Sequence, residues 1–362
     1  MFVWLALLLS TTFYIMAASI PPLPKHIVLG YASWNQCNDK LIEGVRNGVN
    51  VLIWFSIDFS KGTVQRGPDL VCVRSIISKM NSEGFTNVVH LISIGGWNAA
   101  HIDTAAASPL EYYAAWNKWN KEKVAGPGFP TGFHGFDWDL EGNDDLRSQW
   151  NVFTQECLDS MGTISQLAKK NGYYVTMAPA QSYMSPWTSE FSRSVAFKDD
   201  AWETSVPGLN FPYHGRNLYS YVWAKYGPFD LTIVQLYEGY SHTLHSIRFG
   251  GLSPGAAVAS SVRELLHPWK ITLDDGQELT VKINPSQLIV GLANGWADGT
   301  KFLFVDAMGL SDAWYEIGGQ IRGFGFWNVG EEGTLQHGRE PIYLAKELKA
   351  IMEKHVFGEE LR

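Results

Sequence analysis

The chain has 362 residues, enough for one large barrel or two medium-sized domains. Hydrophobic residues make up 46% of it and charged residues 18%, which is typical of a folded globular protein and excludes a largely disordered one. The 36 acidic side chains outnumber the 28 basic ones and give a net charge of −8, which argues against nucleic-acid or anionic-membrane partners, because such partners select a basic face.

The chain begins with a segment typical of a secretory leader. Residues 2–18 carry no charge and are mostly apolar, and the small residues up to Ser19 suit cleavage. We predict a signal peptide over 1–19 and a Pro-rich spacer over 20–25. The alternative is an uncleaved anchor, for which the segment is short. No later stretch is long and apolar enough to cross a bilayer, so we expect a secreted, extracellular protein without a membrane span.

Three cysteines, Cys37, Cys72 and Cys157, are scattered along the chain. In a secreted protein, an odd number indicates one disulfide bond and one free thiol, but the sequence does not say which two residues pair. Three scattered cysteines do not form a metal site.

Apolar, strand-like runs alternate with helix-like stretches along most of the chain. The predicted strands are 27–33, 49–56, 88–95, 133–141, 173–179, 231–237, 288–293 and 321–327. The predicted helices are 39–47, 69–82, 109–125, 146–170, 216–226, 255–266 and 339–357. Buried runs rich in Val, Ile and Leu are typical of parallel sheets, so this α/β pattern predicts a single (β/α)₈ TIM barrel over 26–357. A hairpin is expected at 271–280, in the long connection between strands six and seven.

The fourth predicted strand carries acids at every second position. Asp137, Asp139 and Glu141 alternate with Phe136, Trp138 and Leu140. On a strand, the acids share one face, and if that face points inward their crowding raises the pKa of at least one carboxyl group. A solvated edge strand, or a helix with repelling acids, would be the structural alternative. Neighbouring glycines and the aromatic content favour the strand.

Other predicted strands also end in polar or aromatic residues. Residues near these ends include Tyr31, Ser93, Gly96, Trp97, Met177, Gln181, Gln235, Tyr237 and Trp327. In a parallel barrel, the carboxyl ends of all strands meet at one mouth, where catalytic residues are found. Aromatic rings there offer flat apolar faces to a ligand, although Trp97, Trp187 and Trp296 could equally pack in the core.

These motifs, in this order, resemble glycoside hydrolase family 18, the chitinase family. The pattern D-G-x-D-x-D-x-E of the family is matched at 134–141, and its S-x-G-G pattern by Ser93, Gly95 and Gly96. Tyr237 and Trp327 match the Tyr after strand six and the Trp of strand eight. The resemblance covers about residues 26–350.

The resemblance implies substrate-assisted catalysis by four residues, without a cofactor. Glu141 would protonate the glycosidic oxygen, and Asp139 would orient the substrate's acetamido group for attack on the anomeric carbon. Asp137 would share a proton with Asp139, and Tyr237 would donate to the acetamido carbonyl. The expected substrate-binding residues are Tyr31, Gly96, Trp97, Gln181, Gln235 and Trp327.

Two positions depart from the family's pattern. His134 replaces the leading Asp, and Glu238 follows Tyr237 where Asp or Asn is usual. Only about 27 residues separate the last two strands, so the α+β insertion of some members is expected to be absent.

The resemblance implies a monomeric secreted chitinase that hydrolyses β-1,4 linkages between N-acetylglucosamine units and retains the anomeric configuration. An endo-β-N-acetylglucosaminidase acting on N-glycan cores would use the same acids. A chitin-binding lectin on the same scaffold is the third reading, although such proteins usually lack the equivalent of Glu141 or Asp139, and both are present here.

Overall fold

A computed structural model describes residues 19–145, 147–195, 216–334 and 336–359 of the chain. Eight parallel strands form a closed barrel in the order β1-β11-β10-β7-β6-β5-β4-β2, with β2 pairing back to β1. The barrel strands are β1 Ile27–Tyr31, β2 Val51–Ser60, β4 Val89–Gly96, β5 Gly135–Leu140, β6 Tyr174–Met177, β7 Leu231–Gln235, β10 Leu288–Ala293 and β11 Gly323–Trp327. The predicted (β/α)₈ barrel is therefore confirmed.

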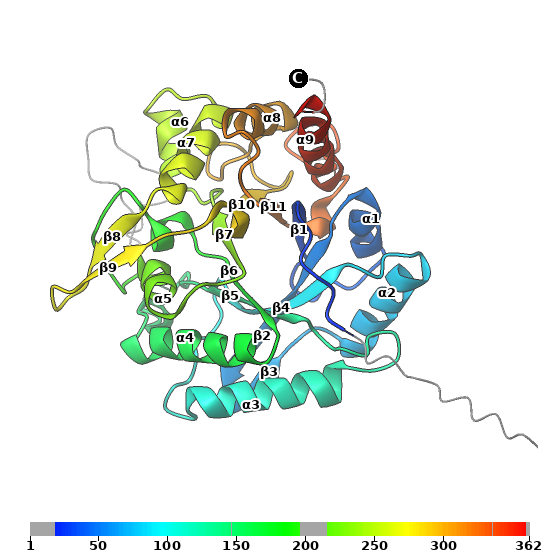
Figure 1. Cartoon of the computed structure of the whole chain (residues 1–362), viewed down its shortest axis with the longest axis vertical. Helices are drawn as coiled ribbons and strands as arrows, with labels where there is room; N and C mark the ends of the chain where they lie inside the picture. The colour runs from blue at the N-terminus through cyan, green and yellow to red at the C-terminus, as the bar shows by residue number, and fades with distance from the viewer. Residues whose placement is uncertain (1–18, 146, 196–215, 335, 360–362) are drawn as a thin grey trace, which may run out of the picture.

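Helices surround the barrel on all sides (Figure 1). They are α1 Lys40–Asn47, α2 Leu70–Ser82, α3 Pro109–Trp119, α4 Gln155–Lys170, α5 Leu218–Tyr226, α6 His242–Arg248, α7 Pro254–Leu266, α8 Ala307–Glu316 and α9 Leu344–Glu359. Short helical turns lie at Asn120–Val124, Gln149–Asn151, Gln181–Met184, Pro285–Gln287 and Val329–Glu331. Two antiparallel pairings complete the fold: β3 Thr63–Arg66 extends β2, and β8 Trp269–Thr272 pairs with β9 Glu278–Val281 at the predicted hairpin.

Two predicted helices begin later in the structure than the sequence pattern suggested. The helix predicted over 146–170 begins at Gln155, because Thr154 caps it by accepting a hydrogen bond from the backbone N–H of Cys157. The segment before it forms the turn Gln149–Asn151 instead. The helix predicted over 339–357 begins at Leu344. The sequence prediction missed α6, α8 and β3.

Side chains alternate across β5 as predicted. Trp138 faces the helical layer, where its indole N–H donates to Ser165 Oγ on α4 at 2.8 Å. Asp137 and Asp139 lie on the opposite face, inside the barrel, with 0% and 4% of their surface exposed. The alternative of a solvated edge strand is therefore wrong.

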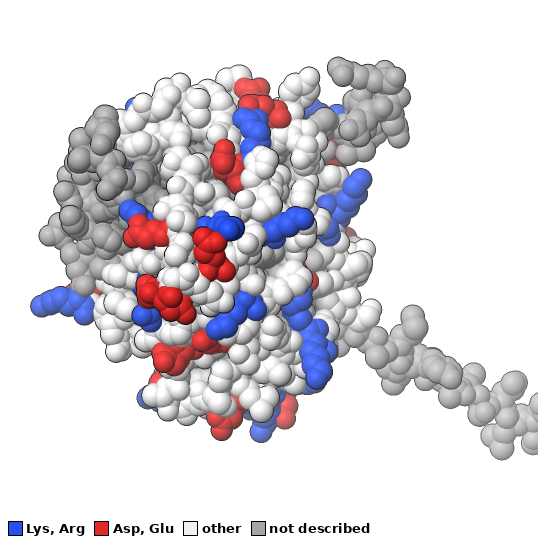
Figure 2. All heavy atoms as spheres, turned by 60° about the vertical axis from the view of Figure 1, so that its left-hand side comes forward, with Lys and Arg blue, Asp and Glu red and all other residues white. Residues whose placement is uncertain are grey.

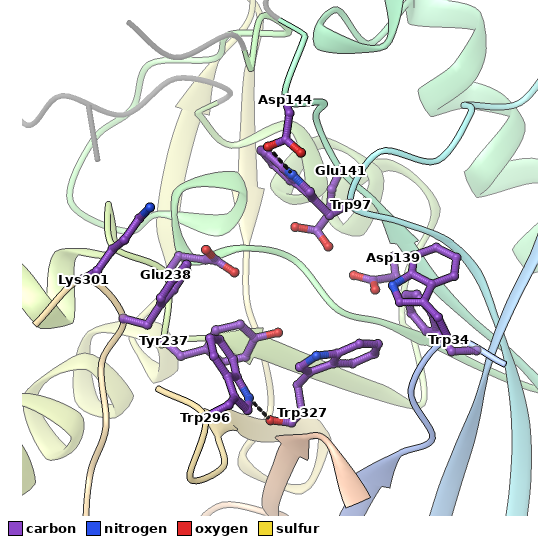
Figure 3. A pocket seen from close by; sticks show the side chains of 12 residues that line it. Trp34, Trp97, Asp139, Glu141, Asp144, Tyr237, Glu238, Trp296, Lys301 and Trp327 are labelled. Atoms are coloured by element: carbon purple, nitrogen blue, oxygen red, sulfur yellow. Dashed lines mark hydrogen bonds between the residues drawn. The ribbon is translucent and has the colours of Figure 1, made fainter. Parts of the chain in front are cut away.

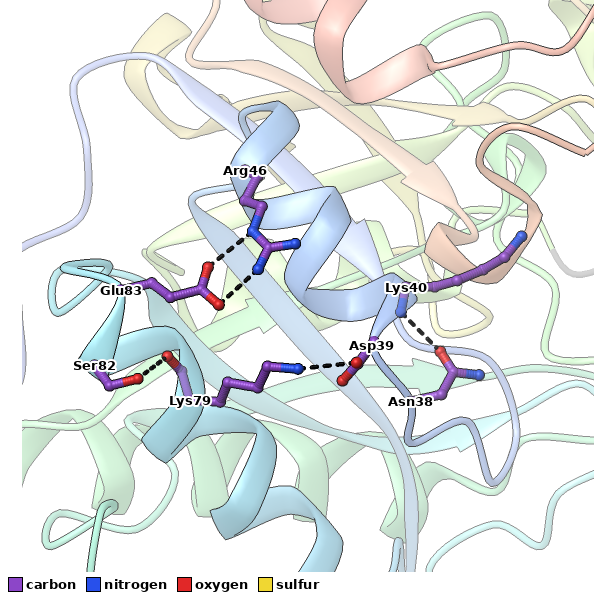
Figure 4. A network of polar contacts seen from close by, with 7 residues as sticks. All are labelled: Asn38, Asp39, Lys40, Arg46, Lys79, Ser82 and Glu83. Carbon is purple, nitrogen blue, oxygen red and sulfur yellow. Dashed lines mark hydrogen bonds and ion pairs between the residues drawn. The ribbon is translucent and has the colours of Figure 1, made fainter.

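The segment from β1 to α1 is linked to α2 by a disulfide bond and by surface ion pairs. Cys37, after β1, is bonded to Cys72 in α2, and Cys157 is a buried free thiol. Arg46 of α1 donates two hydrogen bonds to Glu83 at 2.8 and 2.6 Å, and Lys79 reaches Asp39 at 2.8 Å (Figure 4). Exposed ion pairs contribute little individually, so the disulfide is the main cross-link here.

Charges of both signs are interspersed on the face drawn in Figure 2. Among the described residues, no helix combines the length and the apolar character that a membrane span requires. The predicted signal peptide falls almost wholly on residues 1–18, which lie outside the described part of the chain.

Candidate active site

Asp137 is anchored at the centre of the barrel by neighbouring strands. Its carboxylate accepts hydrogen bonds from the hydroxyls of Thr176 on β6, at 2.5 Å, and of Tyr31 on β1, at 3.0 Å. Complete burial raises the pKa of Asp137 to about 7, although both hydrogen bonds act to lower it. The side chain is therefore fixed in orientation and able to change protonation near neutral pH.

Asp139, two residues further along β5, is held from the other side of the barrel. Gln235 at the end of β7 donates to Asp139 Oδ1 at 2.9 Å. Burial, together with the charges of Glu141 and Asp137, raises the pKa of Asp139 well above its ordinary value. Asp139 therefore has a strong tendency to hold a proton or to share one.

Glu141 follows β5 directly and lies at the mouth of the barrel, with 7% of its surface exposed. Burial raises the pKa of Glu141 well above its ordinary value, and the charge of Glu238 raises it further. Asp139 and Glu141 also share a hydrogen bond, which raises the pKa of Asp139 and lowers that of Glu141. The two carboxyl groups thus titrate as a pair, and near neutral pH the pair retains a proton that it can donate.

The Asp139–Glu141 pair opens into a pocket of about 360 Å³ (Figure 3). In Figure 3 the carboxylates of Asp139, Glu141 and Glu238 and the hydroxyl of Tyr237 point toward its centre. The lining residues are Trp34, Phe55, Trp97, Asp139, Glu141, Asp144, Tyr237, Glu238, Trp296, Lys301, Phe302 and Trp327. Acids and aromatic rings therefore dominate the walls.

Trp327, at the end of β11, is held in place by two neighbouring aromatic residues. Its ring packs edge-on against Phe55, with ring centroids 4.7 Å apart, and its carbonyl oxygen accepts a hydrogen bond from the Trp296 indole at 2.6 Å. Phe55 in turn packs at 4.3 Å against Trp34. These contacts fix the aromatic wall before any ligand arrives.

The opposite wall is fixed by a polar clamp. Asp144 accepts hydrogen bonds from the Trp97 indole at 2.9 Å and from the Asn98 amide at 2.6 Å. The backbone N–H of Asp144 donates back to Asn98 Oδ1 at 2.8 Å. The segments after β4 and β5 are therefore locked together at the rim of the pocket.

Tyr237 and Glu238 lie side by side after β7. Burial, and after it the acidic neighbours, hold the pKa of Tyr237 well above its ordinary value, so its hydroxyl keeps its proton and remains a donor. Burial raises the pKa of Glu238 to about 7. Above that pH, Glu238 adds a further carboxylate charge close to Glu141 in the pocket.

The structure brings most of the predicted site residues together. Asp139, Glu141, Tyr237, Trp97 and Trp327 line the pocket. Asp137, Tyr31, Gln235 and Gly96 lie directly behind these residues rather than among the lining ones.

Gln181 is the exception among the predicted site residues. Its side chain is buried, accepts hydrogen bonds from the backbone and hydroxyl of Thr243, and donates to Ser261 at 3.4 Å. The expected substrate contact is therefore not supported, because the side-chain amide is hydrogen-bonded to residues of α6 and α7. Trp187 also lies outside the lining residues, where it stacks on His242 at 4.0 Å.

The sequence reasoning missed Phe55, Asp144, Lys301 and Phe302. Phe55 lies inside a strand that reads as continuous core. The other three lie in connecting segments, which periodicity does not place. Asp144 had one available signal, its position three residues after Glu141 in a turn-like Gly-Asn-Asp-Asp run.

The arrangement suits acid catalysis on a ligand with flat apolar faces. A protonated carboxyl group is able to donate to a leaving group, and a neighbouring carboxylate with a tyrosine hydroxyl is able to orient a polar substituent. Within the described ranges, no cluster of three or more His, Cys, Asp or Glu side chains could hold a metal ion.

Comparisons of the fold point to one family. The barrel superimposes on a GH18 chitinase from Pseudoalteromonas aurantia with a TM-score of 0.54 and 14% identity, over 90% of this chain and 99% of that one. For a chitinase from Rhizomucor miehei, the TM-score is 0.51 and the identity 13%, over 91% and 100% of the two chains. The fold is that of the GH18 chitinases.

A mutant of the class V chitinase from Nicotiana tobaccum, solved in complex with NAG4, shares this chitinase fold with a TM-score of 0.50 and 12% identity. The alignment covers 90% of this chain and 99% of that one. No protein-family profile matches the sequence, and no curated protein matches it either. At identities this low, the structural similarity establishes only the shared fold, so the argument for activity must come from the site itself.

Proposed function

We propose that this protein is a secreted chitinase-like glycoside hydrolase that cleaves β-1,4 linkages between N-acetylglucosamine units of chitin or chitooligosaccharides. One observation carries the proposal: the buried, proton-sharing pair Asp139–Glu141 opens with Tyr237 into a pocket walled by tryptophans. A bound oligosaccharide in a structural neighbour with the same fold supports a sugar as the ligand.

The chemistry follows from the positions of the side chains. Glu141 gives its proton to the glycosidic oxygen, so the leaving sugar departs as a neutral alcohol. The substrate's own acetamido oxygen attacks the anomeric carbon, while Asp139 accepts the amide N–H and Tyr237 donates to the carbonyl oxygen. Charge that develops on the cyclised acetamido group is balanced by Asp139, whose negative charge is spread through its hydrogen bonds.

The second half of the reaction regenerates the acid. Ionised Glu141 takes a proton from water, and the water opens the ring formed by the acetamido oxygen. Two displacements at the anomeric carbon leave the product with the starting configuration. Asp137 remains behind the pair, where Thr176 and Tyr31 hold it ready to exchange a proton with Asp139.

Substitution Glu141→Gln tests this assignment, because the amide keeps the size of the side chain and removes the proton donor. Turnover of a fluorogenic chitobioside is expected to fall at least about a thousandfold, with thermal unfolding and ligand binding preserved. Undiminished turnover would exclude Glu141 as the acid. Parallel assays on colloidal chitin and on a high-mannose glycoprotein distinguish a chitinase from an endo-β-N-acetylglucosaminidase.

Secretion is part of the proposal and is tested separately. It rests on the apolar leader over 1–19 and accords with the Cys37–Cys72 disulfide, since disulfides persist mainly in oxidising compartments. Sequencing the N-terminus of protein collected from a culture medium should find the chain starting near residue 20. Retention of the leader in cell-associated protein would favour an anchor.

A further inference from the structure

A second hollow, of about 410 Å³, lies on the same rim as the catalytic pocket. Its walls come from the segment 100–105 after β4, from the segment 149–154 before α4, and from Ser60 and Cys157. The chain that follows β4 also carries Trp97 into the catalytic pocket, and the chain that follows β5 carries Asp144 there. The two cavities therefore share two connecting segments, those that follow β4 and β5.

The Trp97–Asp144–Asn98 clamp ties these segments together at the rim. Asn151 reinforces it by donating to the carbonyl oxygens of Asn143 and Asp145 at 3.2 and 2.8 Å. The hydrogen bond between Trp97 and Asp144 is visible beside Glu141 in Figure 3. These side-chain hydrogen bonds hold the two segments that also contribute walls to the second hollow.

His101 lines this hollow and carries an unused acceptor. Only 3% of its surface is exposed, and its Nε2 donates to the carbonyl oxygen of Glu141 at 2.8 Å. A carbonyl only accepts, so Nε2 holds the hydrogen, and burial lowers the pKa of His101 to about 4, which keeps the ring neutral. Nδ1 is then a lone-pair acceptor, and no residue of the described chain donates to it.

Trp150 provides an aromatic surface next to this acceptor. It is half-buried, lines the hollow, and its ring lies 5.5 Å from that of His101 at an angle of 49°. Within the described ranges, its indole N–H also lacks a hydrogen-bond partner. Trp150 is half-buried and His101 nearly buried, so an acceptor and a donor beside one aromatic ring suit an added polar ligand.

We propose that this hollow is a second carbohydrate site, which binds an N-acetylglucosamine unit through the face of Trp150 and a sugar hydroxyl donating to His101 Nδ1. A pyranose ring has an apolar face for the indole and hydroxyls that serve as donors and acceptors. The choice of N-acetylglucosamine rests on the proposed function, since the hollow shares both segments with the pocket where that polymer would be cut.

A ligand bound in this hollow would affect Glu141, the proton donor. His101 connects the hollow to the backbone of Glu141 by a single hydrogen bond. A ligand bound to Nδ1 polarises the imidazole and strengthens the bond from Nε2 to the carbonyl oxygen. The site would thus hold a neighbouring part of the polymer and stiffen the segment that carries the catalytic acid.

Calorimetric titration of the Glu141→Gln protein with the tetramer of N-acetylglucosamine tests the proposal. Two binding events are expected. Adding Trp150→Ala should abolish or weaken one of them by about tenfold or more and leave the other. Tyr315→Ala, which removes an exposed aromatic ring from α8 instead, should keep both. A single binding event that is indifferent to Trp150→Ala would overturn the second site.

The Trp150 variant could lose binding by misfolding, so a second measurement uses a protein whose hollow is unaltered. In the Glu141→Gln protein, the nitrogen NMR signal of His101 Nδ1 should shift as the tetramer is added, in step with the Trp150-dependent event. An unmoved signal would reject the contact. Failure of the proposed function looks different: the wild type would leave the tetramer intact, while Trp150-dependent binding persists.

Discussion

Gln235 donates to Asp139 Oδ1 at 2.9 Å and to the carbonyl oxygen of Ala178 at 2.8 Å. Both hydrogens of its amide nitrogen are thus used, which fixes the side chain between β6 and β7. The bond to Asp139 opposes the rise in its pKa that burial causes, because it stabilises the ionised form. Gln235 is therefore a positioning residue for the carboxylate that orients the substrate.

Substitution Gln235→Met should slow catalysis by roughly tenfold or more, since a hydrogen bond to a charged group contributes about 1.5–3 kcal/mol. The pKa of Asp139 should rise further, so the acidic limb of the profile of kcat against pH should move to higher pH. Steady-state kinetics on the chitobioside between pH 4 and pH 9 measures both effects. An unchanged pH profile would contradict this role.

Gln181→Met is the matched control for that substitution. Gln181 is equally buried, but its hydrogen bonds go to Thr243 and Ser261 rather than to an acid. The variant should have a lower Tm and an unchanged kcat. A selective loss of kcat in this variant would return Gln181 to the site.

Glu238 should set the alkaline limit of activity. Its charge raises the pKa of Glu141, and its own pKa of about 7 means that it ionises as the solution becomes neutral. The new charge then holds the proton on Glu141 to higher pH. In Glu238→Gln, the basic limb of the kcat/KM profile should move to lower pH.

Asp144→Asn serves as the comparison for Glu238→Gln. Asp144 is another acid of the pocket, but it is engaged with Trp97 and Asn98 and is not a cause of the raised pKa of Glu141. Its removal should change KM and leave the basic limb in place. Equal shifts in both variants would point to a general charge effect instead.

Two histidines at the other end of the barrel should make the fold sensitive to acid. His134 Nδ1 accepts a hydrogen bond from the backbone N–H of His90 at 3.0 Å, and burial lowers the pKa of His134 to about 4. The pKa of His90 is lowered too, by burial and by His134. The unfolded chain takes up protons near pH 6.5 while the folded one does not, so stability falls as the pH drops from about 6.5 toward 4.

His134→Asn retains an acceptor for the backbone of His90 and removes the titrating ring. The difference between the pKa of His134 in the unfolded and in the folded chain corresponds to at most about 3 kcal/mol. The Tm of this variant should therefore fall clearly less between pH 7 and pH 4 than that of the wild type. Thermal unfolding at several pH values measures it. Parallel curves for the two proteins would show that other groups govern the acid response.

The Cys37–Cys72 disulfide should contribute about 3–4 kcal/mol to the free energy of unfolding, given its sequence separation of 35. A reductant, or the double change of both cysteines to Ser, should lower the free energy of unfolding by a similar amount and therefore lower the Tm. The ion pairs beside it in Figure 4 are exposed and would not replace it. Cys157→Ala should leave the sensitivity to reductant unchanged, and a loss of that sensitivity would point to a different pairing.

The sequence predicted the barrel because its strands are buried on both faces and its acids alternate in register. Period-two spacing placed Asp137 and Asp139 inside and Trp138 outside, as the structure has them. The predicted start of α4 was wrong because the helix was extended back to residue 146, over the segment that precedes Gln155. A capping residue, Thr154, decides that boundary.

Predictions for the site failed where tertiary contacts decide. Gln181 and Gln235 look alike in the sequence, each at or just beyond the end of a strand, yet only Gln235 meets an acid. The walls formed by Lys301 and Phe302 come from connecting segments, whose paths depend on what they pack against. The disulfide pairing likewise required the positions of α2 and of the end of β1.

Gly96 is the position where a methyl group should damage the pocket most directly. Its φ of 108° is unfavourable for other residues, and an added Cβ would overlap the ring of Phe55 and press on Trp34 at 3.0 Å. Since Phe55 supports Trp327, Gly96→Ala should raise KM for chitooligosaccharides severalfold in addition to lowering Tm. Gly172→Ala has a similar φ of 82° with open space around it, so it isolates the backbone strain. It should lower Tm alone, and an equal rise of KM in both variants would refute the steric argument.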